Sequence, residues 1–126
     1  MRAGNLQVAA DANPRSYAAV ALASRDGKAL GESQRMLLVA VDKAENSGLA
    51  WTADRRSATK AWTGEVQVTG VSAAIELATT TPGLAVWALD GRGARIAEVP
   101  STRADGKLSF RISPELRTVW YEITTH

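Results

Sequence analysis

Apolar and polar residues alternate with a period of two over several short stretches of this chain. Over residues 107–112 and 118–124 the apolar side chains recur at every second position, which is the pattern of a strand with one buried and one solvent-facing side. The residues predicted to face a core are Val66, Val68, Leu108, Phe110, Ile112, Val119, Tyr121 and Ile123. Trp120 lies between two of these positions and is therefore expected to point away from the core.

Three Asp-Gly dipeptides, at residues 26–27, 90–91 and 105–106, separate apolar-rich segments. Both residue types tolerate the positive φ of a type I′ turn, so each dipeptide predicts a β-hairpin. The predicted strands are Leu6–Ala10, Ala18–Ser24, Met36–Val41, Glu65–Thr69, Ala73–Thr79, Leu84–Leu89, Ala94–Val99, Lys107–Ile112 and Thr118–Thr124. Short strands with a turn about every ten residues are typical of an all-β fold, here an antiparallel two-sheet β-sandwich of about eight or nine strands.

The segment RMLLVAVDKAENSGLAW, residues 35–51, departs from the alternation. Met36–Val41 is continuously apolar, which predicts a central strand covered on both faces. The connection from Val41 to Trp62 is long, polar and charged, and it contains no clear strand. Long loops in compact domains are often functional, and this one holds Trp51 and ends at Trp62.

Length and composition predict one domain that covers residues 1–126. The chain is 45% hydrophobic and 22% charged, which is typical of a soluble globular protein. No apolar run approaches the roughly 18 residues of a membrane-spanning helix, so we expect no membrane partner. The first residues, MRAGNLQVAA, make a poor secretory signal, and the lack of cysteine excludes disulfides.

The net charge of +2 comes from 15 basic and 13 acidic residues that are mixed along the chain. Nucleic-acid-binding proteins concentrate Lys and Arg on one face or in runs, whereas only Arg55 and Arg56 are adjacent here. A solvated surface of mixed charge is the better interpretation, and we expect no nucleic-acid partner.

Catalytic chemistry has few candidate residues in this sequence. The only histidine is His126, the last residue, so a histidine-dependent nucleophile or zinc site has no usable imidazole. Glu65, Glu76 and Glu122 lie at solvent-side strand positions, which favours a solvated face over paired acid–base catalysis. We therefore expect a domain that is not an enzyme and that needs no cofactor.

Oxygen donors gather in the long connection, at Asp42, Glu45, Asn46 and Asp54. Calcium binds about six to eight oxygens, so a calcium site is conceivable there. The spacing does not follow an Asp-x-Asp-x-Asp pattern, and Asn and Asp are frequent in turns for local reasons. The turn interpretation is preferred, and no metal ligand is predicted.

Tryptophan is the most frequent aromatic residue, with four Trp against two Tyr and one Phe. An indole has a large flat face and one N–H donor, so it can fill a core, stack on a sugar ring or pack on another domain. Trp87 lies inside a predicted strand and is expected in the core. Trp51 and Trp62 have small or polar neighbours, and for them core packing and ligand binding are equally open.

The segment YAAVALASRDGKALGESQRMLLVAVDKAENSGLAW, residues 17–51, resembles C-terminal accessory β-domains of large bacterial glycoside hydrolases. The matching positions are Ser24, Asp26–Lys28, Leu30, Ser33, Arg35, Met36–Val41, Ala44–Leu49 and Trp51. The terminal TVWYEI, residues 118–123, is similar to the strand with which such enzymes often finish. Arg25, Ala29 and Ser47 stand where the resemblance leads one to expect Leu, Pro and Thr.

This resemblance implies a non-catalytic piece of a polysaccharide-degrading enzyme, extracellular or periplasmic in its parent. The favoured function is a carbohydrate-binding module whose partner is a polysaccharide or oligosaccharide. The alternative is a structural accessory domain that packs on the catalytic domain of the parent glycoside hydrolase. The predicted ligand-binding residues, chosen for stacking and for hydrogen bonds to hydroxyls, are Trp51, Trp62, Trp120, Glu45, Asn46 and Asp54.

Overall fold

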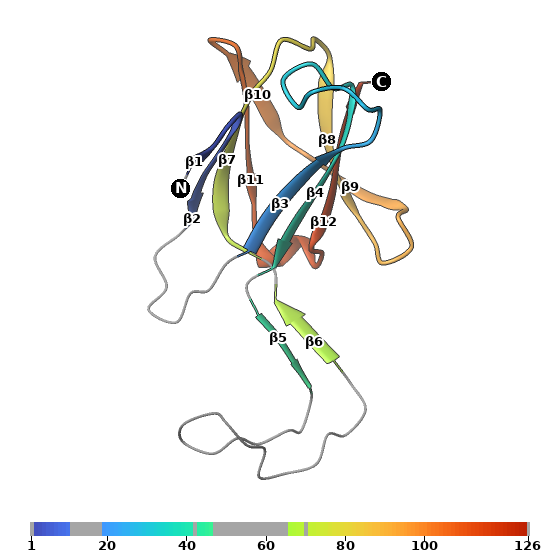
Figure 1. Cartoon of the computed structure of the whole chain (residues 1–126). Coiled ribbons are helices and arrows are strands. Elements are labelled where there is room, and N and C mark those ends of the chain that lie inside the picture. Colours follow the sequence, from blue (N-terminus) through green and yellow to red (C-terminus); the bar gives the residue numbers. More distant parts are fainter. Residues whose placement is uncertain (1, 11–18, 42, 47–65, 70, 126) are drawn as a thin grey trace.

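The structure of the chain, a computed structural model, describes residues 2–10, 19–41, 43–46, 66–69 and 71–125. Over these residues the fold is all-β, with twelve strands, one short 3₁₀ helix at Pro114–Leu116 and no α-helix (Figure 1). Accordingly, this part of the chain contains no helix that could cross a membrane. The predicted fold class, an antiparallel two-sheet β-sandwich, is confirmed.

Two antiparallel sheets of five strands each form the sandwich. Sheet A has the order β1 (Arg2–Ala3), β2 (Leu6–Ala10), β7 (Ala73–Ala78), β11 (Lys107–Ile112) and β10 (Ser101–Ala104). Sheet B has the order β3 (Ala19–Ser24), β4 (Arg35–Val41), β12 (Trp120–Thr125), β8 (Leu84–Leu89) and β9 (Arg95–Val99). The two sheets lie as facing layers in Figure 1.

The core lies between the sheets because each strand turns alternate side chains inward. Its largest fully buried side chains come from both layers and include Met36, Leu38, Ile75, Leu77, Leu108, Ile112, Tyr121 and Ile123. Phe110, only 5% exposed, joins them from β11. The predicted inward positions on β11 and β12 are therefore confirmed.

Two parts of the predicted inward set turn out differently. Val119 is only half-buried, because β12 begins one residue later, at Trp120. Val66 and Val68 lie in a described strand, but their side chains are outside the described residues.

The continuous apolar run of β4 was predicted to have both faces covered, and this is wrong. β4 is central, between β3 and β12, but only its inward residues are fully buried. Its outward residues Leu37, Val39 and Val41 are half-exposed. A run of apolar residues indicates that both faces of a strand are apolar, but it does not show whether another element covers each face.

A separate two-stranded ribbon pairs β5 (Lys43–Asn46) with β6 (Val66–Thr69). The connection after Val41 was expected to hold no strand, which is wrong because β5 begins two residues later. β6 is the strand expected at Glu65–Thr69, but it pairs with β5 and belongs to neither sheet. Figure 1 shows this ribbon projecting from the end of the sandwich at which β4 ends.

Only one of the three Asp-Gly dipeptides forms a two-residue hairpin turn. Asp105 and Gly106 have φ angles of 54° and 73°, and Ala104 pairs with Lys107 across them. This is the geometry of a type I′ turn. The other two dipeptides lie in longer loops. At residues 26–27 only Gly27 has a positive φ, and at residues 90–91 neither residue does, because the positive φ of that loop falls on Gly93.

Candidate functional site

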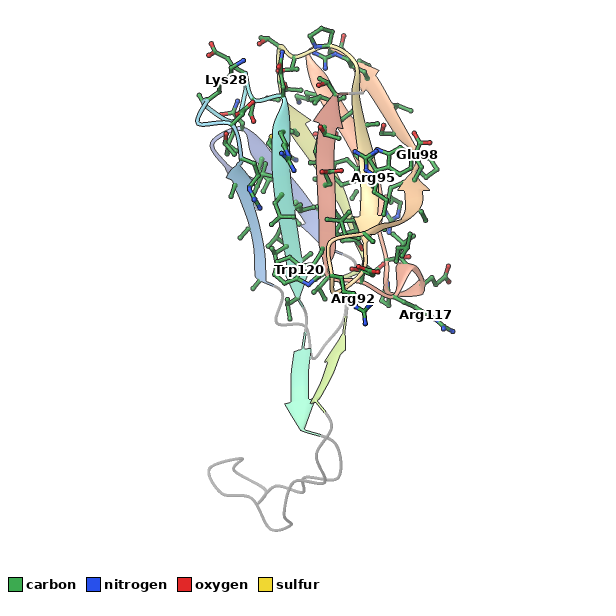
Figure 2. The ribbon with its side chains drawn as sticks, turned by 90° about the vertical axis from the view of Figure 1, so that its right-hand side faces the viewer. Lys28, Arg92, Arg95, Glu98, Arg117 and Trp120 are labelled. Atoms are coloured by element: carbon green, nitrogen blue, oxygen red, sulfur yellow. The ribbon has the colours of Figure 1, made fainter. Side chains whose placement is uncertain are left out.

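The outer face of sheet B is apolar over β3 and β4. The outward residues of these strands are Ala19, Ala21, Ala23, Leu37, Val39 and Val41. Trp120 pairs with Val39 across the β4–β12 ladder and is 39% exposed, so its indole adds an aromatic surface to this face (Figure 2). The prediction that Trp120 points away from the core is confirmed.

Thr118 fixes the start of β12 and hence the position of Trp120. Its hydroxyl donates to the carbonyl of Leu89 on β8 and accepts from the Trp120 amide, with 3.0 Å between oxygen and nitrogen. A threonine at this position therefore ties the entry of β12 to its neighbour strand. The indole is presented from a paired strand and not from a free loop.

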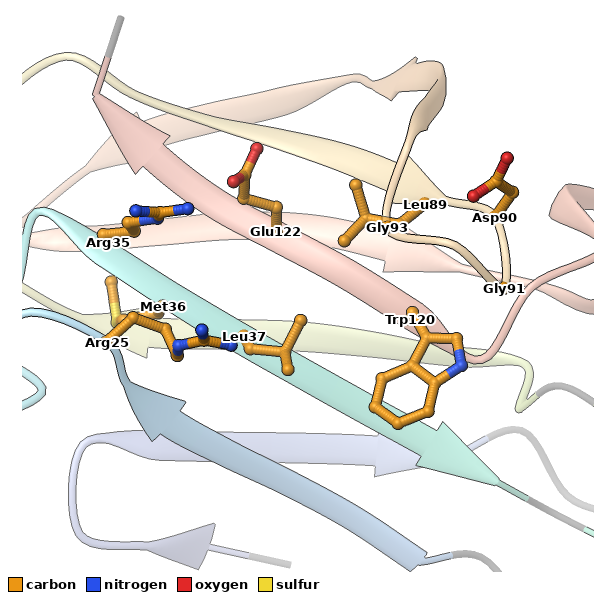
Figure 3. A pocket seen from close by; sticks show the side chains of 10 residues that line it. All are labelled: Arg25, Arg35, Met36, Leu37, Leu89, Asp90, Gly91, Gly93, Trp120 and Glu122. Atoms are coloured by element: carbon orange, nitrogen blue, oxygen red, sulfur yellow. The ribbon is translucent and has the colours of Figure 1, made fainter.

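A hollow of about 330 Å³ lies on the same face, between β4, β12 and the β8–β9 turn. Figure 3 shows its plan: Trp120 stands at one end, Arg25 and Arg35 stand at the other, and Leu37 lies between them. Glu122 and the turn at residues 90–93 form the remaining side. The hollow thus combines an exposed ring, an apolar floor and charged groups on one strand-built surface.

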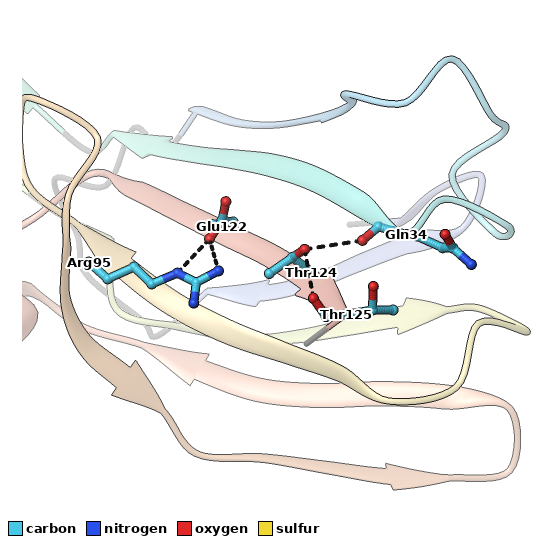
Figure 4. A network of polar contacts seen from close by, with 5 residues as sticks. All are labelled: Gln34, Arg95, Glu122, Thr124 and Thr125. Carbon is cyan, nitrogen blue, oxygen red and sulfur yellow. Dashed lines mark hydrogen bonds and ion pairs between the residues drawn. The ribbon is translucent and has the colours of Figure 1, made fainter.

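Glu122 is held by an arginine from two strands away. Arg95 on β9 places Nε and Nη2 at 2.8 Å and 2.7 Å from Oε1 of Glu122 (Figure 4). The same guanidinium lies over the ring of Trp87, with 4.7 Å between Cζ and the ring centroid. A cation stacked on an indole and bound to a carboxylate has little rotational freedom, so Glu122 has a fixed orientation.

Trp87 was expected in the core, and this is wrong. It pairs with Glu122 across the β8–β12 ladder and shares the outward side of sheet B, where it is half-buried under Arg95. The inward residues of β8 are Leu84, Val86 and Ala88, which the core needs at these positions. None of the described tryptophans is part of the core.

Asp90, the second acid beside the hollow, caps its own turn. Its Oδ1 accepts hydrogen bonds from the amides of Arg92 at 2.8 Å and Ala94 at 2.9 Å. Two amide donors on one oxygen satisfy much of the acceptor capacity of this carboxylate. Asp90 therefore stabilises the turn that borders the hollow.

Arg25 and Arg35 are brought together by strand pairing. The Arg25 amide donates to the Arg35 carbonyl at 2.8 Å, at the end of the β3–β4 ladder, and both side chains line the hollow. Among the described residues, neither guanidinium makes a hydrogen bond or an ion pair. Both extend toward the middle of the hollow in Figure 3.

The loop that joins the two arginines is organised around the carboxylate of Asp26. It accepts hydrogen bonds from the amide of Gln34 at 2.8 Å, the hydroxyl of Ser33 at 2.8 Å, the hydroxyl of Ser24 at 2.9 Å and the amide of Lys28 at 3.2 Å. The bond from the Gln34 amide, followed by that from the Ser33 hydroxyl, holds the pKa of Asp26 well below its usual range. This loop is therefore fixed by an ionised carboxylate.

The sequence-predicted site residues fall into three groups. Trp120 lies at the hollow. Glu45 and Asn46 are in β5, on the projecting ribbon, and the description of these residues covers their backbone alone. Trp51, Asp54 and Trp62 lie outside the described residues. The structure therefore does not bring these six residues together, and only Trp120 is placed at a defined surface.

Sequence reasoning missed Arg25, Arg35, Leu37 and the ion pair of Glu122 with Arg95. Two arginines at the two ends of an Asp-Gly loop between paired strands are a usable signal, since hairpin pairing places such residues near each other. The ion pair had no comparable signal, because its residues are 27 positions apart and meet through the order of β9, β8 and β12.

The described residues contain no group of three or more His, Cys, Asp or Glu side chains that could hold a metal ion. Asp42 and Asp54, two of the four residues considered for calcium, lie outside the described part of the chain. A comparison of the chain with protein-family models, with curated proteins and with solved structures finds no match. The functional argument consequently starts from the hollow itself.

Proposed function

We propose that this domain is a non-catalytic carbohydrate-binding module that holds a polysaccharide or oligosaccharide on the outer face of sheet B. The observation that carries the proposal is the exposed indole of Trp120 at one end of a hollow bordered by charged and polar groups. An indole face stacks on the apolar face of a pyranose, and side chains around it can bind hydroxyls. In this proposal the parent protein is a glycoside hydrolase, extracellular or periplasmic.

The two acids of the hollow support binding rather than hydrolysis. A glycosidase needs one carboxylic acid to protonate the leaving group and a second carboxylate as base or nucleophile. Asp90 is engaged by the amides of its own turn, and Glu122 is engaged by Arg95. With these partners, the two carboxylates are not placed as an acid and a base on either side of one glycosidic bond.

The expected affinity is weak. An indole that removes about 60–80 Å² of apolar surface from water gains roughly 1.5–2 kcal/mol. Trp51 and Trp62, which the sequence also suggests as stacking residues, would add similar amounts. After the cost of association, such a site should bind with Kd between about 1 mM and 10 μM.

The test is affinity electrophoresis through gels that contain different soluble polysaccharides, together with pull-down on insoluble ones. Trp120→Ala should weaken binding about tenfold to thirtyfold, the equivalent of one stacked ring. Ile96→Ala is the matched control, because Ile96 is an exposed large apolar residue on β9 that does not line the hollow. Trp51→Ala and Trp62→Ala, tested beside it, show whether the tryptophans predicted from sequence also contact the sugar.

The alternative is an accessory domain that packs on the catalytic domain of its parent. The exposed alanines of β3 and the half-exposed outward residues of β4 favour it, because small apolar side chains suit close contact with another protein. This alternative replaces the first if no polysaccharide retards the wild type while Ala21→Lys weakens association with the catalytic domain. If a polysaccharide retards the wild type and Trp120→Ala is no longer retarded, docking on a catalytic domain cannot be the sole function.

A further inference from the structure

The pair of arginines at the hollow is not explained by the stability of the fold. Arg25 directly follows β3 and its amide donates to the carbonyl of Arg35, the first residue of β4, so two like charges start from neighbouring backbone positions, which is destabilising. Within the described part of the chain no acid pairs with either of them. A bound anion would offset this repulsion.

The acids that could have neutralised them already have other partners. Glu122 binds Arg95, Asp90 caps the β8–β9 turn, and Asp26 is surrounded by donors of its own loop. Among the described residues, Arg25 and Arg35 thus carry positive charge without an acidic partner at their end of the hollow. Guanidinium groups recognise carboxylates and sulfates through two parallel hydrogen bonds, which makes this end suitable for an anion.

The spacing along the strands determines how long such a ligand must be. Arg35 pairs with Thr124, and Val39 pairs with Trp120, so the arginine end and the indole are four residues apart along the ladder. Four residues of a strand span about 13 Å. This backbone spacing suits a short oligosaccharide laid over Leu37, with one ring at each end.

We propose, building on the carbohydrate-binding function above, that the hollow is specific for an acidic glycan. One sugar ring stacks on Trp120, and the carboxylate or sulfate of another ring of the same chain binds Arg25 and Arg35. The acidic group is the specificity-determining feature, and the ligand is an oligomer.

The test compares charged and uncharged forms of the same glycans. Affinity electrophoresis with polygalacturonate, alginate, hyaluronan and carrageenan identifies the best acidic ligand and distinguishes carboxylate from sulfate. Titration calorimetry then compares that glycan with its methyl-esterified or desulfated form. The charged form should bind at least about tenfold more tightly, and this preference should fall with added salt.

Arg25→Gln and Arg35→Gln should each weaken binding of the charged form about tenfold and affect the uncharged form much less. Lys107→Gln, an exposed cation of sheet A, is the control for loss of charge alone. Equal binding of charged and uncharged forms, or arginine variants that keep the preference, would overturn the acidic specificity. If Trp120→Ala still weakens binding about tenfold or more in that case, the carbohydrate-binding proposal stands. If no glycan binds at all, both proposals are wrong.

Discussion

The two sheets bury one shared core, yet their outer faces differ in chemistry. The outward residues of sheet A on β2, β7 and β11 are Gln7, Ala9, Ala74, Glu76, Ala78, Lys107, Ser109 and Arg111. On sheet B the corresponding surface carries the alanines of β3, the apolar residues of β4 and the exposed Trp120. The outer face of sheet A therefore carries mainly small, polar and charged side chains, whereas sheet B presents apolar and aromatic groups to solvent.

The ion pairs of the two faces show the same difference. On sheet A, Lys107 Nζ is 3.9 Å from Glu76 Oε2, and both side chains are almost half exposed. On sheet B, Arg95 Nη2 is 2.7 Å from Glu122 Oε1, and the glutamate side chain is 18% exposed. Exposed pairs at long distance contribute little, while a stacked and partly buried pair has defined geometry.

The comparison separates what core packing requires of the two sheets from what it leaves open. Core packing requires apolar inward residues on both sheets, but it does not determine which kinds of residue face outward. The outer face of sheet B carries an exposed indole and two arginines, Arg25 and Arg35, that make no hydrogen bond or ion pair with the other described residues.

The largest expected effect tests the common core beneath both faces. Phe110→Ala should lower the free energy of unfolding by about 3–5 kcal/mol, because it removes a buried ring and leaves a cavity. Ser109→Ala, the next residue on β11 but on the outer face, should change it by less than about 0.5 kcal/mol. Urea denaturation followed by circular dichroism measures both; similar losses would mean that the inward and outward sides are misassigned.

The second prediction concerns a substitution that gives the outer face of sheet B a charged residue, as on sheet A. Leu37→Glu puts a carboxylate on the floor of the hollow, where it can pair with Arg25 or Arg35 and occupy the anion site. Half-burial of Leu37 implies a cost of about 1–2 kcal/mol in unfolding free energy. Binding of acidic glycans should fall more than tenfold, whereas Ser109→Glu on sheet A should leave it unchanged. If Leu37→Glu binds acidic glycans as well as the wild type does, the hollow is not the binding site.

The third prediction concerns the Asp26 loop, which supports the arginine end of the face. Asp26 has a depressed pKa in the folded protein, so its contribution to stability is present above its unfolded value near pH 4 and is lost as pH falls toward the folded value. Asp26→Asn should therefore lower the thermal midpoint by a similar amount from pH 8 to about pH 4, and the difference should narrow below that. Asp105→Asn, in the exposed β10–β11 turn, is the control. A difference that is independent of pH down to pH 2 would contradict the ionised-loop account.

A fourth prediction contrasts neighbours on β12 that face opposite ways. Tyr121 is buried on the inner side of β12, and loss of hydration raises the pKa of its phenol to about 12. A raised pKa stabilises the fold below the unfolded value near pH 10, and this contribution is lost as pH rises through about 12. Tyr121→Phe should consequently unfold at higher pH than the wild type, while Trp120→Ala keeps the wild-type alkaline transition. Thermal midpoints between pH 9 and pH 12 measure the effect.

The smallest expected effects compare the two ion pairs directly. Arg95→Ala removes the contacts with Glu122 and Trp87 and should cost about 0.5–1 kcal/mol. Lys107→Ala breaks the exposed pair on sheet A and should be close to neutral. Double-mutant cycles with Glu122→Ala and Glu76→Ala isolate each pair energy; equal coupling energies would remove this distinction between the faces.

The sequence by itself determined which residues form most strands and which side of them is inward. Alternation on β11 and β12 placed Phe110, Tyr121 and Trp120 on the correct sides, because side-chain direction along a strand is a local property. It also determined the Asp105–Gly106 turn, which depends on two residues that tolerate positive φ. The absence of an imidazole within the described strands likewise follows from sequence alone.

Only the tertiary structure decided what those strands lie beside. The outward sides of β4 and β8 are equally apolar in sequence, yet Leu37 remains half-exposed while Leu89 is buried. The strand order of sheet B brought Arg95 to Glu122 and placed Arg25, Arg35 and Trp120 around one hollow. The physical reason is that strand pairing and the covering of a face depend on the packing of all elements together. The alternation that marks a strand, in contrast, depends only on the residues of that strand.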